Sequence, residues 1–181
     1  RGPLQEEPSG MVGPLRSNML TLSIRPEILF AEERAMIEAE TGKLIERRPL
    51  PPDEVLDYML SARQRSQWEK FFLYLDLESL YLKNPGRAES YKRMSEENRR
   101  AAIARYRDQL RSETVDVDIL VIPSEYEIIQ TSYTPLEARV TVIEKFQYRD
   151  YVEVKRYTYF LERRDSIWVV TDYEIVNLGT E

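Results

Sequence analysis

The side chains best suited to chemistry gather in the last third of the sequence. Glu144, Arg156 and Asp172 stand there in segments whose alternating pattern is typical of β-strands. Three tyrosines accompany them in the sequence: Tyr157, Tyr159 and Tyr173. A carboxylate buried in a pocket has a raised pKa and can act as a proton-transfer base, while a tyrosine hydroxyl can donate a hydrogen bond to a developing oxyanion. One hypothesis is therefore an enzyme that uses a carboxylate and a tyrosine.

The same three charges have a structural interpretation, which we favour because charges on long antiparallel strands are usually solvated. Side chains of opposite charge pair when they face each other across neighbouring strands. Glu144, Arg156 and Asp172 would then form a cross-strand salt bridge on the solvent face of the sheet.

The residue types that are missing narrow the chemistry further. The chain has no histidine and no cysteine, which excludes a Ser-His-Asp triad, His-ligated zinc, disulfides and a thiolate nucleophile. The acidic pairs Glu96-Glu97 and Asp116/Asp118 lack the loop spacing of a calcium site. With only six glycines, the chain has no glycine-rich phosphate loop. We expect no metal and no cofactor.

Composition and charge indicate one globular domain. The chain has 181 residues, 42% of them hydrophobic, and a net charge of −6, which argues against nucleic-acid binding. No apolar run is long enough for a transmembrane segment. Eight basic and four acidic residues lie between Arg87 and Arg111; we interpret them as a solvated helix face, with a docking face for an acidic partner as the alternative.

The twelve tyrosines and two tryptophans also have two interpretations. Tyrosine has a high strand propensity, so packing in strands explains many of them, but tyrosines also line ligand pockets and interfaces. We interpret Trp68 and Trp168 as core anchors.

An extended N-terminal arm is predicted over residues 1–52. Residues 1–15 are rich in glycine and proline, residues 19–30 predict a strand interrupted at Pro26, and residues 31–40 predict a short helix. Because the sequence starts at Arg1, we expect a processed or truncated chain whose start once followed a signal or lipid-anchor segment.

Helical periodicity follows the arm. Apolar stripes predict three helices, over residues 54–75, 77–82 and 96–111. Asp53 and Ser95 are expected to be N-caps, and Asn84-Pro85-Gly86 is expected to end the second helix. The polar stretch 61–67 predicts a kink or a break in the first helix.

From Val115 onward the apolar period changes to two. It predicts strands at residues 115–121, 126–133, 138–148, 151–162 and 166–177. Because the last three are long and joined by short connections, they should pair antiparallel and curl into a cone over a helix. The predicted inward set is Val140, Val142, Phe146, Tyr148, Tyr157, Tyr159, Leu161, Trp168, Val170 and Val176.

The other face of the predicted sheet is also partly apolar, at Ile143, Phe160, Ile167 and Ile175. Both faces should therefore be covered. The helices would cover one, and a second subunit or the N-terminal arm the other.

Several segments resemble the nuclear transport factor 2-like superfamily over about residues 53–177. Trp68-Glu69-Lys70-Phe71-Phe72 is similar to the helix that caps the cone, and Leu77-Glu78-Ser79-Leu80-Tyr81 to the short second helix. The segments 138–142, 157–161 and 167–175 resemble its long strands, the last of them beginning with Ile167-Trp168. The resemblance implies an α+β fold, in which N-terminal helices pack on a strongly curved antiparallel sheet over residues 53–181.

The resemblance implies a cone but not one function, since the superfamily includes enzymes, transport factors and accessory domains. Its enzymes commonly place an Asp, Tyr or His inside the cone. The residues we predict to line such a pocket are Trp68, Phe72, Tyr106, Val142, Glu144, Phe146, Arg156, Tyr157, Tyr159, Trp168 and Asp172.

Three functions follow as hypotheses. The leading one is a non-catalytic binding or scaffold module that binds a protein partner in a bacterial cell envelope or periplasm, with the cytoplasm as the alternative. The second is a small-molecule isomerase, dehydratase or hydrolase using a carboxylate and a tyrosine. The third is a homodimer or larger assembly formed through the sheet face.

Overall fold

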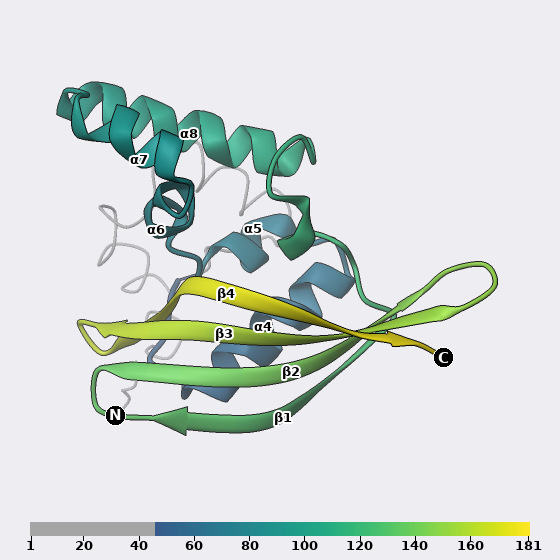
Figure 1. The fold of residues 1–181 in the computed structure, drawn as a ribbon. Coiled ribbons are helices and arrows are strands. Elements are labelled where there is room, and N and C mark those ends of the chain that lie inside the picture. The colour runs from purple at the N-terminus through teal and green to yellow at the C-terminus, as the bar shows by residue number, and fades with distance from the viewer. Residues whose placement is uncertain (1–45) are drawn as a thin grey trace, which may run out of the picture. The chain divides into compact units, whose positions relative to one another are not determined.

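The computed structural model describes residues 46–181, and residues 47–181 form one compact unit. The glycine- and proline-rich stretch, the strand and the short helix predicted for the N-terminal arm within residues 1–40 lie outside the described residues. The fold is α+β, as predicted: helices come first, and a four-stranded antiparallel sheet follows (Figure 1). The helices are α4 (Pro52–Gln64), α5 (Trp68–Phe72), α6 (Leu77–Leu82), α7 (Pro85–Lys92) and α8 (Glu96–Arg111).

The first predicted helix is broken into α4 and α5. The break falls in the polar stretch, where Ser66 has a φ of 57° in the left-handed region. The prediction that Asp53 caps this helix was wrong, because Pro51 is the N-cap and Pro52 takes the first helical position. Proline suits that position, since its fixed φ matches the helix and its missing N–H needs no partner there.

The sequence Asn84-Pro85-Gly86 does more than end α6. Asn84 is the N-cap of α7, and its side-chain oxygen accepts a hydrogen bond from the backbone N–H of Arg87 at 3.1 Å. The prediction of a stop there missed α7, because Asn followed by Pro is also a helix-start signal. The prediction for α8 was confirmed, including the cap by Ser95, which accepts from the N–H of Asn98 at 3.2 Å.

The predicted strand at 115–121 was wrong. Asp116 has a φ of 45°, which turns the backbone out of the extended conformation, and Val117–Ile119 form a short 3₁₀ turn, η2. Ile119 is buried at the end of that turn. Leu120, the next residue, is buried as well, so two adjacent side chains anchor an irregular connection in which burial does not alternate.

The sheet has strand order β1-β2-β3-β4, and every neighbouring pair is antiparallel. Its strands are β1 (Glu125–Tyr133), β2 (Glu137–Gln147), β3 (Val152–Arg164) and β4 (Ile167–Thr180). All four were predicted within about three residues of their ends. The two-residue turn between β3 and β4 uses Asp165 and Ser166, both with positive φ, as tight hairpins require.

The buried face of the sheet includes eight of the ten residues predicted to point inward. The exceptions are Tyr148, beyond the end of β2, and Val176, which are 41% and 45% exposed. A bulge between Phe160 and Leu161 places one extra residue in β4. The alternation reverses at a bulge, so Val176 is on the outer face although Val170 is wholly buried on the inner one.

Helix α4 covers the inner face of the sheet (Figure 1). Four of its apolar side chains are wholly buried: Val55, Leu56, Met59 and Leu60. The chain after α5 then joins the free side of β4. The N–H of Val170 donates to the carbonyl of Tyr74 at 2.8 Å, and the N–H of Asp76 donates to the carbonyl of Val170 at 2.8 Å. Within residues 46–181, no helix combines the length and apolar character needed to cross a membrane.

Candidate functional site

Three polar side chains meet in the interior between α4 and the sheet. Glu144 on β2 and Arg63 on α4 form an ion pair, and both side chains are wholly buried. The hydroxyl of Tyr159, on β3, donates to Glu144 Oε2 at 2.6 Å, while Arg63 donates to Oε1. Both oxygens of the carboxylate are therefore hydrogen-bonded to side chains of the same domain. We call Arg63, Glu144 and Tyr159 the interior cluster.

Arg63 is held from several sides. Its Nη1 donates to the carbonyl of Ile119 at 2.8 Å, which ties the turn η2 to α4. Its guanidinium carbon lies 5.9 Å from the centre of the Phe71 ring and 5.8 Å from that of Tyr157. A guanidinium that is buried among rings and carbonyls is restricted to one position, so it acts as a fixed cross-link.

Burial is the largest single influence on the pKa of each member of the interior cluster. It raises the pKa of the Glu144 carboxyl, and this effect outweighs the opposite influence of Arg63 and Tyr159. Burial also raises the pKa of the Tyr159 hydroxyl far above its usual range, and the Glu144 charge adds to the rise. For Arg63, burial lowers the pKa, but Tyr159 and Glu144 outweigh it and the pKa is raised. Tyr159 thus stays protonated and donates to Glu144 throughout the physiological range.

Arg156 and Asp172 do not join Glu144, so the cross-strand salt bridge predicted among them does not form. In the β2–β3 register Glu144 pairs with Lys155, so Arg156 is on the other face of the sheet, where it is exposed. Asp172 instead pairs with Lys83, the C-cap of α6, at 2.7 Å. Successive residues of a strand face opposite sides of the sheet. Because Arg156 is one residue beyond the partner of Glu144, the two side chains lie on opposite faces and cannot form an ion pair.

The other predicted pocket residues are distributed over the inner face and its helical cover. Near the interior cluster lie Val142, Phe146 and Tyr157, with the Phe146 and Tyr157 rings 6.3 Å apart. Trp68 and Phe72 are both on α5, 6.4 Å apart. The remaining two lie elsewhere. Tyr106 of α8 packs on Tyr81, 5.4 Å away, and Trp168 packs on Tyr133, 6.3 Å away.

The basic residues of α7 and α8 are mostly engaged within the domain. Arg87 pairs with Asp116 at 2.7 Å, and Arg107 and Arg111 both pair with Glu69 of α5. Three of the others pair with acidic neighbours on their own helix: Lys92 and Arg93 with Glu89, and Arg100 with Glu96. Six of the eight basic residues in this stretch therefore pair with carboxylates of the domain, which favours the solvated helix face over a docking face for an acidic partner.

Two hollows open on the described part of the surface. One, of about 460 Å³, lies between the chain before α4, the outer side of α4 and Lys70 of α5. The other, of about 270 Å³, is lined by residues that include Lys83, Arg87 and Tyr106. Across residues 46–181 no group of three or more acidic side chains is arranged to hold a metal ion.

Sequence reasoning missed Arg63. It is the central residue of the interior cluster, yet it stands in the polar stretch that predicted a helix break. Its signal was present: Leu56, Met59, Leu60 and Arg63 continue one helical stripe at spacings of three and four residues. A charge that extends an apolar stripe predicts a buried partner, and Glu144 is that partner.

Together these features define a helix-covered antiparallel sheet whose interior cluster joins α4 to β2 and β3. A family model described as "Flagellar collar protein C, C-terminal domain" matches residues 53–181. The match covers more than half of the sequence, and the chain belongs to that family. Neither the curated proteins nor the solved structures contain a match to the chain.

Proposed function

We propose that this chain is a non-enzymatic structural component of a bacterial flagellar collar and that its sheet-and-helix domain binds other proteins there. The family match over residues 53–181 is the observation that carries the proposal. The family is described as a domain of a collar protein, and a collar is a structure built from protein contacts. Of our three hypotheses, the scaffold and the assembly formed through the sheet face fit this description, and the small-molecule enzyme does not.

The interior cluster supports a structural role. A general base must reach the proton that it removes. Glu144 is wholly buried and both its oxygens accept hydrogen bonds from Arg63 and Tyr159. A substrate would have to displace these partners and leave a buried guanidinium without its counter-ion, which is costly.

Three finer points belong to the same proposal. We place the domain in the bacterial cell envelope, because the family that matches it is described as a flagellar collar protein domain. We keep the cone of the nuclear transport factor 2-like superfamily as its fold. We also keep self-association through the outer face of the sheet, where Ile143, Phe160 and Val176 are partly exposed.

Deletion of residues 53–181 in the bacterium that makes this chain tests the structural role. We expect the collar to be incomplete in electron cryo-tomograms of the flagellar base. A collar of normal size and occupancy, with the shortened chain present at normal abundance, would contradict the proposal.

A second variant separates structure from catalysis. Arg63→Met combined with Glu144→Leu removes both charges and replaces them with side chains of similar volume, which buried pairs often tolerate. If the role is structural, cells with this double variant keep a normal collar as long as the domain folds. An enzyme would lose its activity in the same folded variant, and the collar would fail.

A further inference from the structure

The larger hollow has rigid walls. Arg47–Pro51 form a strap before α4, stiffened by the prolines at positions 49 and 51 and by a hydrogen bond from the Leu50 N–H to the Arg48 carbonyl at 2.8 Å. The strap is tied down by two hydrogen bonds: the Arg48 N–H donates to the Tyr74 hydroxyl at 2.8 Å, and Arg47 Nε donates to the Leu73 carbonyl at 2.6 Å. A preformed hollow binds a ligand without the entropy cost of first ordering its walls.

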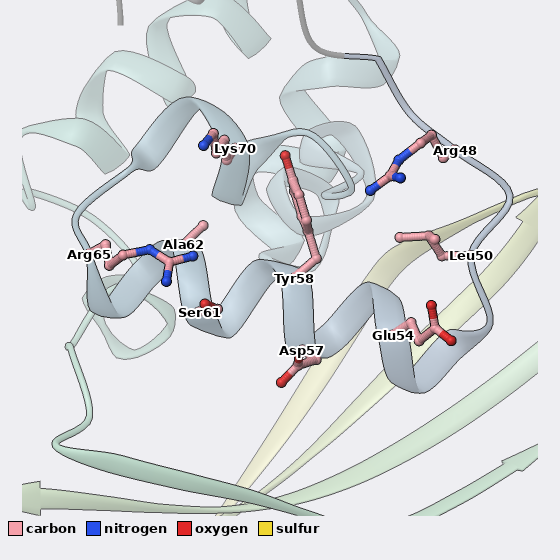
Figure 2. Close-up of a pocket in the computed structure, with 9 residues that line it drawn as sticks. All are labelled: Arg48, Leu50, Glu54, Asp57, Tyr58, Ser61, Ala62, Arg65 and Lys70. Atoms are coloured by element: carbon pink, nitrogen blue, oxygen red, sulfur yellow. The ribbon is translucent and has the colours of Figure 1, made fainter. Parts of the chain in front are cut away.

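Cationic side chains dominate the chemistry of this hollow. Arg48, Arg65 and Lys70 come from the strap, the end of α4 and α5, and within residues 46–181 none of them forms an ion pair with a carboxylate. In Figure 2, Arg48 reaches from the strap toward Tyr58, while Arg65 and Lys70 occupy the opposite end of the hollow. The cations are thus spread along the hollow rather than gathered at one point.

The acidic residues of the lining compensate these cations only in part. Asp57 points away from the strap in Figure 2, and its Oδ1 accepts from the Tyr126 hydroxyl of β1 at 2.8 Å. The lining thus holds two carboxylates, Glu54 and Asp57, against three cations, and Asp57 is already engaged by Tyr126. Leu50 and Tyr58 add apolar contact area between the charged ends.

We propose that this hollow is a docking site for an acidic segment of a partner protein in the collar. Arginine binds carboxylates through two parallel hydrogen bonds, and two cationic ends suit a segment with acidic side chains several residues apart. A volume of about 460 Å³ accommodates a few side chains. This inference rests on the proposed function, because it names the chemistry of a partner within that assembly.

Photo-crosslinking of the full chain in its own bacterium tests the site. A p-benzoylphenylalanine in place of Ser61, an uncharged residue of the lining, should crosslink to a segment with at least two carboxylates within about six residues, mapped by mass spectrometry. The same probe in place of Ser90, an exposed serine of α7, is the matched control. Capture of the same segment from both positions, capture of a segment without carboxylates, or no crosslink at position 61 would each overturn the proposal.

Reversing the charges of the hollow is the second test of the docking site. Arg48→Glu with Arg65→Glu should lower the yield of the crosslink from position 61 at least tenfold, whereas Arg48→Lys with Arg65→Lys should retain most of it. Thermal unfolding of both double variants checks that the domain still folds. An unchanged yield in the folded charge-reversed variant would also overturn the docking site. The crosslink is read independently of collar size, so the docking site and the structural role can fail separately.

Discussion

Glu144 and Arg63 lie 81 positions apart in the sequence and form an ion pair in which both side chains are wholly buried. The pair joins β2 to α4, and the Arg63 bond to the Ile119 carbonyl adds the connection before β1. A buried pair of this kind contributes specificity more surely than net stability, since desolvation of the two charges offsets much of their attraction.

Removal of one member of this pair should destabilise the domain strongly. Arg63→Met alone, or Glu144→Leu alone, leaves an uncompensated buried charge. We expect each to lower the free energy of unfolding by about 3–5 kcal/mol. Urea denaturation followed by circular dichroism measures this loss.

The double variant is the control. Arg63→Met with Glu144→Leu leaves no stranded charge, so we expect it to be more stable than either single variant. A double variant whose loss equals the sum of the two single losses would show that the pair is not coupled.

Asp76 should make stability depend on acid pH. Burial raises the pKa of its carboxyl, but hydrogen bonds from Ser79 and Arg164 outweigh burial, and the pKa is lowered overall. The unfolded chain therefore binds the proton more tightly. The stabilisation by Asp76 is present above its unfolded pKa and is lost as the pH falls through the lower, folded pKa.

Asp76→Asn is the variant that reveals this dependence. Urea midpoints should differ between wild type and variant at neutral pH, and the difference should shrink steadily as the pH falls below about 4. A difference that stays constant over the acid range would contradict the predicted proton linkage.

Ser95 should stabilise the start of α8. Its hydroxyl oxygen accepts from the N–H of Asn98. We expect Ser95→Ala to cost about 1 kcal/mol, the usual effect of losing an N-cap. Ser90→Ala, inside α7 on an exposed position, is the matched control and should be neutral or slightly stabilising. Equal effects of the two substitutions in thermal unfolding would argue against a capping role.

Substitution of Glu69 should also destabilise the domain. Its carboxylate is only 6% exposed and pairs with Arg107 and Arg111, which ties α5 to α8. Glu69→Gln should lower the free energy of unfolding by about 2 kcal/mol, since hydrogen bonds to charged groups contribute more than neutral ones. Glu96→Gln is the control. It breaks the exposed pair with Arg100 and should change the free energy of unfolding by less than about 0.5 kcal/mol.

The sequence was sufficient to predict α8 and the four strands, because their periodicity is regular and their caps and turns carry specific residue types. It was insufficient at 115–121, where the adjacent buried residues Ile119 and Leu120 anchor an irregular connection whose apolar pattern resembles that of a strand. The orientation of Val176 depends on a bulge near Phe160, which no alternation pattern reveals. The sequence predicted only part of the interior cluster. Glu144 and Tyr159 were among the predicted pocket residues, but their partner Arg63 comes from a helix 81 positions before Glu144.

The hydrogen bonds between Val170 and the chain at Tyr74–Asp76 have a consequence for biosynthesis. All the helices leave the ribosome before β4 does, so a nascent chain must wait for its last strand before this link can close. Until then, the apolar side of α4 lacks part of its final cover. A stop codon early in β4 would therefore affect the helical layer about a hundred residues upstream, as well as the sheet that lost a strand.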